Sequence, residues 1–179
     1  DAKKTAAFIK ESWSSSVLQK LQDYILIPNQ SIDFDPEIHT NGYQEQAVEL
    51  ITSWVKKQNV QGLKLTVHHD KGRTPLIFME IDAFNIPENK TSEFTILLYG
   101  HFDKQPPLTD EWDSDLHPWK PIIKNGKLYG RGGADDGYAV YGAVDSIRAI
   151  QSQGLSHPRC CIVIEGSEES GSVDLWHYL

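Results

Sequence analysis

Polar residues directly follow three strand-like stretches of the chain. The apolar run at 94–98 leads into Tyr-Gly-His-Phe-Asp at 99–103. A short hairpin-like stretch leads into Gly-Arg-Gly-Gly-Ala-Asp-Asp at 130–136, and a third apolar run leads into Glu-Gly-Ser-Glu-Glu at 165–169. One histidine and several carboxylates therefore stand at three predicted strand ends, and this mixture of side chains suits a divalent metal ion.

The order of the predicted elements indicates an α/β domain. A chain of 179 residues is long enough for one domain with a substantial core. Helical spacing of apolar residues predicts four helices: over residues 3–26, from Asn41 to near Gly62, after Asp136 up to Gly154, and from Ser170 onward. Alternating or continuous apolar runs predict strands at 63–67, 76–81, 94–98 and 160–164, and a hairpin at 122–129. We therefore expect a mixed sheet flanked by helices. The near-continuous hydrophobicity of residues 94–98 predicts a central strand that helices cover on both faces.

Several local signals refine this expectation. Asn41 followed by Gln44 predicts a capping box at the start of a helix. Asn125-Gly126 predicts a type I′ turn in the hairpin. Residues 27–40 have no periodicity and are predicted to form a loop. The Pro-, Asp- and Trp-rich residues 106–121 also lack a period, and a loop of that length inside a compact domain is usually functional.

Composition excludes several classes of protein. The net charge is -8, from 25 acidic and 17 basic residues, and no Lys/Arg cluster could follow a phosphate backbone, so we expect no nucleic-acid partner. No window of about 18 apolar residues exists, so we expect no membrane span. Cys160 and Cys161 are neighbours and cannot form a disulfide framework. Buried thiols favour a reducing compartment, and we expect a cytoplasmic protein.

Each polar strand end also has a structural interpretation. His101 could be a hydrogen-bonded histidine, Asp135 and Asp136 could cap the helix that follows them, and Glu168-Glu169 could be a solvated pair. Taken together, however, five acidic groups and one histidine at three successive strand ends would repel one another without a cation. Because loops beyond the carboxyl ends of strands converge in an α/β sheet, we expect His101, Asp135 and Glu169 to approach one another.

The glycine-rich stretch at 130–133 raises the alternative of a nucleotide site. Two aspartates stand where the phosphate would lie, and Asp135 occupies the place of the third glycine of the dinucleotide fingerprint. The glycines are better explained as residues that let the backbone turn sharply and approach a metal.

The three motifs resemble a known enzyme family. Gly-His-Phe-Asp at 100–103, Gly-Arg-Gly-Gly-Ala-Asp-Asp-Gly at 130–137 and Glu-Gly-Ser-Glu-Glu-Ser-Gly at 165–171 are similar, in order and spacing, to those of the di-zinc metallopeptidases that include glutamate carboxypeptidase, carnosinase and aminoacylase. The stretches at 111–115 and 126–132 look most like the dipeptidase and carnosinase branch. The resemblance covers roughly residues 40–179, and residues 1–39 add little to it. We therefore expect an N-terminal helical segment and loop at 1–40 and part of a zinc-exopeptidase-like catalytic domain at 41–179.

The resemblance implies a role for each candidate residue. His101 would bind one metal, Glu169 the other, and Asp135 would bridge the two. Asp103 would orient the imidazole of His101, and Glu168 would be the general base that deprotonates a metal-bridging water. The two ions would be zinc, with manganese or cobalt as alternatives, and the Asp135–Asp136 peptide bond would be cis. The implied activity is hydrolysis of the amide bond of small peptides or N-acyl amino acids.

The chain departs from the family pattern in two places. The family usually has Asp-Asp-Lys-Gly where this chain has Asp136-Gly137-Tyr138, so the role of that lysine is absent or supplied elsewhere. The family's remaining Asp and His ligands and its lid domain, through which a homodimer could form, would lie beyond Leu179. We therefore expect the N-terminal part of a longer enzyme, which by itself binds zinc weakly and is inactive. The rival hypothesis is a stand-alone metal-binding or regulatory module without catalysis.

Overall fold

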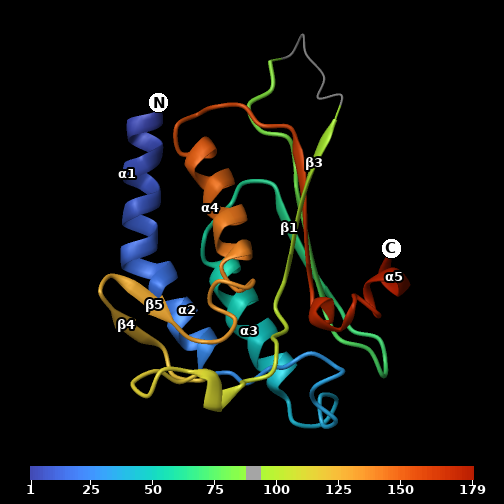
Figure 1. The fold of residues 1–179 in the computed structure, drawn as a ribbon. Coiled ribbons are helices and arrows are strands. Elements are labelled where there is room, and N and C mark those ends of the chain that lie inside the picture. Colours follow the sequence, from blue (N-terminus) through green and yellow to red (C-terminus); the bar gives the residue numbers. More distant parts are fainter. Residues whose placement is uncertain (88–93) are drawn as a thin grey trace.

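A four-stranded mixed sheet forms the centre of the computed structural model, which describes residues 1–87 and 94–179 (Figure 1). The strand order is β1 (Leu63–His68), β2 (Leu76–Ile81), β6 (Arg159–Glu165) and β3 (Thr95–His101). The β1–β2 and β2–β6 pairs are antiparallel, whereas β3 and β6 are parallel. The predicted mixed α/β architecture is therefore confirmed.

Helices cover one face of this sheet (Figure 1). They are α1 (Ala2–Ser12), α2 (Leu18–Ile25), α3 (Tyr43–Lys56) and α4 (Ala139–Gln151), with a π-helical segment, Trp13–Val17, joining α1 to α2. The core between these helices and the sheet includes Leu21, Ile51, Val144, Met79 and Ile162. The N-terminal helices therefore share one hydrophobic core with the strands.

Shorter elements lie outside the four-stranded sheet and the helical layer. The hairpin β4 (Ile122–Lys124) and β5 (Lys127–Tyr129) turns at Asn125 and Gly126, both with positive φ, as predicted. Two 3-10 turns, Thr109–Glu111 and Glu168–Ser170, and the short helix α5 (Leu175–Tyr178) complete the described elements. The predicted loop between Ile81 and the 94–98 run falls partly on residues 88–93, outside the described ranges.

The prediction that residues 94–98 form a central, doubly covered strand is wrong. Within the described ranges β3 pairs only with β6 and lies at the edge of the sheet. Leu97 is 66% exposed and Tyr99 is 50% exposed, because the helical layer covers the opposite face of the sheet. An apolar run indicates that a strand is suited to burial, but it does not indicate how many strands of the same chain pair with it.

The predicted capping box at Asn41 does not form. Asn41 Oδ1 does accept a hydrogen bond from the N–H of Tyr43, at 3.0 Å. Gln44 instead donates to the carbonyl of Gln30, at 2.9 Å, and so ties the start of α3 to the preceding loop. The Gln44 amide is therefore turned to a tertiary partner instead of accepting from the N–H of Asn41, which donates to the carbonyl of Glu37 at 2.9 Å, and spacing along the chain could not indicate this.

Candidate metal centre

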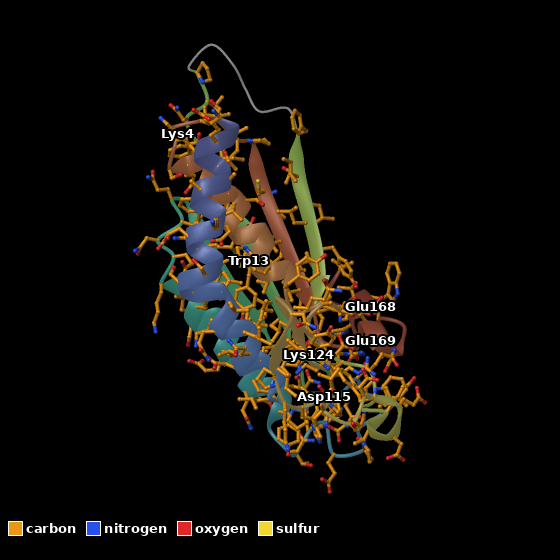
Figure 2. The ribbon with its side chains drawn as sticks, turned by 60° about the vertical axis from the view of Figure 1, so that its left-hand side comes forward. Lys4, Trp13, Asp115, Lys124, Glu168 and Glu169 are labelled. Atoms are coloured by element: carbon orange, nitrogen blue, oxygen red, sulfur yellow. The ribbon has the colours of Figure 1, made fainter. Side chains whose placement is uncertain are left out.

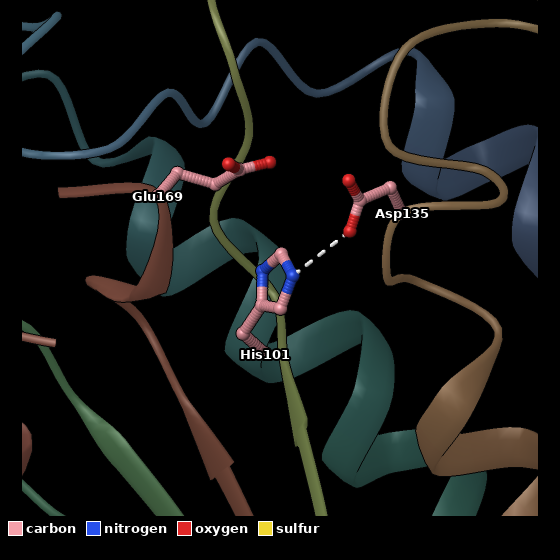
Figure 3. A group of neighbouring side chains, drawn as sticks. All are labelled: His101, Asp135 and Glu169. Atoms are coloured by element: carbon pink, nitrogen blue, oxygen red, sulfur yellow. Dashed lines mark hydrogen bonds and ion pairs between the residues drawn. The ribbon is translucent and has the colours of Figure 1, made fainter. Parts of the chain in front are cut away.

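Three predicted ligands meet at one end of the sheet. His101 is the last residue of β3, Asp135 lies in the loop before α4, and Glu169 lies in the 3-10 turn after β6. One ligand atom of each side chain lies within 4.8 Å of one atom of the other two (Figure 3). His101 Nε2 and Asp135 Oδ1 are 3.1 Å apart. The group is the one candidate metal cluster found in residues 1–87 and 94–179.

Parallel pairing of β3 and β6 brings these residues together. His101 is opposite Glu165 in the register, so both strands end at the same edge of the sheet. Gly100 lets the start of α4 approach this edge, since a Cβ there would lie 2.8 Å from Ala139 Cβ and 2.9 Å from Asp136 Oδ2. The glycine therefore permits the loop of Asp135 to lie over the end of β3.

Asp103 links the histidine to the glutamate turn. Its carboxylate is fully buried and accepts from the backbone N–H of Glu168, at 3.1 Å, and of Glu169, at 3.0 Å. His101 Nδ1 lies 3.1 Å from the carbonyl oxygen of Asp103 and 3.3 Å from its Oδ1. Nδ1 is therefore engaged by Asp103, and Nε2 faces Asp135.

Two carboxylates of the centre are more exposed. Asp135 is 76% exposed, and Glu168 is 41% exposed with Oε2 lying 3.7 Å from His101 Nε2. Glu168 and Glu169 are adjacent at the end of the sheet (Figure 2). Glu169 Oε2 accepts a hydrogen bond from Gln105 Nε2, a contact between residues 64 positions apart that the sequence did not indicate.

The electrostatics around His101 reflect the excess of acidic groups there. Burial opposes protonation of His101, but the hydrogen bond and charge of Asp103, with help from Glu168 and Asp135, raise the pKa of the imidazole to about 9. Burial raises the pKa of Glu168, against the lowering effect of His101, and Glu169 raises it further. Burial likewise raises the pKa of Asp136. A proton on His101 therefore supplies positive charge where a cation would supply it.

The donor set fits a divalent cation. Imidazole nitrogen and carboxylate oxygen both bind zinc, and three protein ligands are the number that a catalytic zinc site uses when its fourth position is left open. Two ligand bonds of about 2.1 Å at a tetrahedral angle place the ligand atoms about 3.4 Å apart, close to the 3.1 Å between Nε2 and Oδ1. Small movements of the exposed carboxylates can complete such a shell.

The N-terminal segment contacts the centre from its buried side. The carbonyl oxygen of Phe102 accepts from Tyr24 Oη, at 2.6 Å, and from Asn29 Nδ2, at 2.5 Å. Lys104 is fully buried, and its Nζ donates to the carbonyls of Tyr24, at 2.7 Å, and Ile27, at 2.6 Å. Sequence analysis missed these residues, because contacts over more than 70 positions leave no local pattern.

Other histidines and acidic residues lie outside the cluster. His68, His69, His117 and the 110–115 loop belong to no metal-ligand group in the described part of the chain. Gly137, at the family's lysine position, lies against Tyr24, since a Cβ there would be 2.4 Å from Tyr24 Cε1. The Asp135–Asp136 peptide bond is cis, as the resemblance implied.

A histidine and carboxylates gathered beyond the carboxyl ends of parallel strands place the chain in the class of α/β proteins with a candidate metal centre. Comparison with known proteins narrows this class. Residues 97–177 match the model of peptidase family M20/M25/M40. The match covers less than half of the chain, and over these residues the chain is similar to that peptidase family.

Individual relatives show the same similarity. A Cys-Gly metallodipeptidase of Schizosaccharomyces pombe is 38% identical over 90 residues, which are 49% of this chain and 18% of that protein. A cysteinylglycine-S-conjugate dipeptidase of Corynebacterium striatum is 31% identical over 160 residues, or 88% of this chain and 32% of that protein. The crystal structure of human carnosine dipeptidase 1 superposes with a TM-score of 0.69 at 22% identity, covering 99% of this chain and 36% of that structure, and shares its fold.

The chain thus spans about a third or less of the length of the relatives it matches. Within residues 1–87 and 94–179, none of the helices has the length and apolar character that crossing a bilayer requires.

Proposed function

We propose that this chain is part of a metal-dependent peptidase that hydrolyses the amide bond of small peptides, of the dipeptidase or carboxypeptidase type. The observation that carries the proposal is the convergence of His101, Asp135 and Glu169, with Glu168 beside them. Two relatives are named as dipeptidases that act on Cys-Gly or cysteinylglycine conjugates, and a third, from mouse, as a Beta-Ala-His dipeptidase. Dipeptides are therefore the first substrates to test, with N-acyl amino acids as the second class.

His101, Asp135 and Glu169 would hold the cation. A divalent cation at this position polarises a carbonyl oxygen and lowers the pKa of a nearby water. Asp103 keeps Nδ1 of His101 engaged, so that Nε2 remains the ligand atom. Its two bonds to the backbone of Glu168 and Glu169 fix the direction in which both glutamate side chains leave the turn.

Glu168 is the proposed general base. Its Oε2 faces the same space as His101 Nε2, at 3.7 Å, and its exposed side chain can reach a water in the open position. A general base works best when its pKa lies near the pH of the reaction, and the pKa of the Glu168 carboxyl is raised in that direction. Such a group takes a proton from water and returns it to the leaving amine. Its neighbour Glu169 would remain a ligand, so the two adjacent carboxylates would have different roles.

The number of ions is also part of the proposal. The described residues offer three ligand atoms in one group, which is enough for one ion in the 179-residue chain. A second ion would share Asp135 and needs ligands beyond these three. We therefore propose that the chain alone binds one zinc ion and has no turnover, whereas the complete protein binds two.

The test uses two variants of the complete protein. Glu168→Gln is expected to retain zinc, measured by elemental analysis after dialysis, and to lose at least about 100-fold in kcat. Asp135→Ala is expected to lose zinc and activity together. Wild-type kcat for zinc-loaded Glu168→Gln would contradict the assignment of the base. Zinc bound without turnover of dipeptides or N-acyl amino acids by the unsubstituted complete protein would favour a metal-binding module instead.

The compartment is a further proposal. Cys160 and Cys161 are buried free thiols, which supports a reducing compartment and hence the cytoplasm. Cell fractionation of the tagged complete protein tests this, and recovery in a secreted fraction would contradict it.

A further inference from the structure

A lysine is fully buried directly behind the metal centre. Lys104 follows Asp103 in the chain, and none of its side chain reaches solvent. Its Nζ donates to the carbonyls of Tyr24 and Ile27 at the C-terminal end of α2, at 2.7 and 2.6 Å, and lies 3.8 Å from the centroid of the Tyr24 ring. A buried amino group is costly unless its N–H groups are paired, and both of these acceptors are main-chain oxygens at a helix end.

Burial lowers the pKa of the Lys104 amino group well below its ordinary value. A neutral amine still has two N–H groups, and the structure supplies two carbonyl acceptors. The anchoring contacts therefore do not require the charged form.

The backbone of the same segment is held by the same region. Lys104 pairs with Gln30 in an isolated parallel bridge, and its carbonyl accepts from the N–H of Ser31, at 3.0 Å. Two residues earlier in the chain, the Phe102 carbonyl accepts from Tyr24 Oη and Asn29 Nδ2. Residues on both sides of Asp103 are thus fixed to the segment at 24–31.

The lysine stem also touches the loop of the second ligand. A Cβ at Gly132 would lie 2.5 Å from Lys104 Cε, so the methylene groups pack directly on the backbone three residues before Asp135. Lys104 is consequently connected to all three ligand segments: to His101 through the chain, to Glu169 through Asp103, and to Asp135 through Gly132.

We propose that Lys104 is a positioning residue for the metal centre, whose buried amino group fastens residues 102–104 to the end of α2 and thereby fixes the geometry of His101, Asp135 and Glu169. This inference rests on the proposed metal-binding function. It assigns a role to a lysine that touches neither the cation nor the substrate, and it gives the N-terminal segment a function in metal binding. Removing a residue that holds a metal ligand in position typically lowers metal affinity by about 10–100-fold.

The test is a cobalt titration of the 179-residue chain and its variants, since the visible absorption of Co²⁺ depends on the number and geometry of its ligands. Lys104→Met keeps the length of the stem and removes the donors. We expect it to raise the Kd for Co²⁺ about tenfold and to change the absorption spectrum. Tyr24→Phe removes only the hydroxyl bonded to Phe102, and we expect a rise of about threefold with a smaller spectral change.

The matched control is Arg148→Met. Arg148 of α4 also holds an N-terminal helix, because it donates to Ser12 Oγ at 3.2 Å and pairs within α4 with the buried Asp145 at 2.5 Å; its hydrogen bonds go to these two residues and not to residues 102–104. We expect it to lower the melting temperature and to leave both the Kd for Co²⁺ and the spectrum unchanged. This combination separates loss of stability from loss of positioning.

The outcomes are distinct. A folded Lys104→Met variant with the wild-type Kd and spectrum would overturn the inference. If Lys104→Met does not fold, an unchanged Kd and spectrum in Tyr24→Phe would overturn it, and the predicted changes in Tyr24→Phe would support it. Failure of the unsubstituted chain to bind Co²⁺ would instead contradict the proposed metal site and, with it, this inference.

Discussion

The two sides of the metal centre differ in how they are held. On the buried side, Asp103 and Lys104 are fully enclosed, and His101 is 6% exposed. On the open side, Asp135 is 76% exposed and Glu168 is 41% exposed. The buried side is fixed by the fold before any cation binds, whereas the exposed carboxylates can move to meet one. Substitutions on the buried side should therefore affect both stability and metal binding, and those on the open side only metal binding.

The largest expected effect is that of Asp103→Ala. It leaves the backbone N–H groups of Glu168 and Glu169 without their acceptor, and it leaves Nδ1 of His101 with only the backbone carbonyl of residue 103. We expect the free energy of unfolding to fall by about 3 kcal/mol and zinc affinity to fall at least about tenfold. Urea denaturation and zinc titration against a chelator measure the two effects.

Asp135→Ala is the matched control on the open side. It removes a ligand, so zinc binding should be lost, but unfolding of the metal-free variant should change by no more than about 0.5 kcal/mol. Equal losses of stability in the two variants would abolish the distinction between the two sides.

A smaller effect is expected at Gly100, where α4 approaches β3. A Cβ would meet Ala139 Cβ and Asp136 Oδ2, so Gly100→Ala should destabilise the chain by about 1–3 kcal/mol. Gly142, inside α4, has no atom within 4 Å of its ideal Cβ, and Gly142→Ala should be neutral or stabilising by up to about 1 kcal/mol. Thermal denaturation of the two variants compares them, and similar melting temperatures would show that Gly100 is not constrained.

The pH dependence of the metal-free chain reports the charge on the buried side. Because the folded chain raises the pKa of His101 from its ordinary value near 6.5 to about 9, its protonated form stabilises the fold. This contribution is fully present below pH 6.5 and is lost as the pH rises through 9. We expect the free energy of unfolding in the presence of a chelator to fall by about 3 kcal/mol between these values. A His101→Gln variant with the same pH dependence would contradict this origin.

The smallest effect is expected at the exposed edge of the sheet. Leu97 is 66% exposed, so Leu97→Thr should change the stability of the 179-residue chain by no more than about 0.5 kcal/mol. Ile162→Thr on the adjacent strand β6 is the contrast, because Ile162 is fully buried and its loss should cost several times more. Comparable losses would show that the edge strand is covered in solution.

Local patterns predicted most of the secondary-structure elements correctly. The strands β1, β2 and β6, the hairpin at Asn125-Gly126 and the helix stripe of α4 are set by neighbours in the chain, so alternation and helical spacing reveal them. His101, Asp135 and Glu169 could be grouped because parallel strands end at one edge of a sheet. Their roles as ligands, and that of Glu168 as base, remain predictions.

Tertiary contacts account for what the sequence did not indicate. The edge position of β3 depends on which strands pair with it, and the apolar run is compatible with either position. Gln44 bonds to Gln30 and Gln105 to Glu169, and neither partner is at a spacing that a local motif would specify. The burial of Lys104 could not be predicted for the same reason. A lysine is normally exposed, and the carbonyl that accepts from its Nζ belongs to Tyr24, 80 positions earlier in the chain.

Zinc K-edge X-ray absorption of the zinc-loaded 179-residue chain tests the central claim most directly. A centre formed by His101, Asp135 and Glu169 predicts one imidazole and otherwise oxygen ligands, at about 2.0–2.2 Å, with no sulfur. The imidazole contribution should disappear in His101→Ala. Sulfur scattering at about 2.3 Å, or two or more imidazoles per zinc, would contradict the assignment of these three residues as the metal centre.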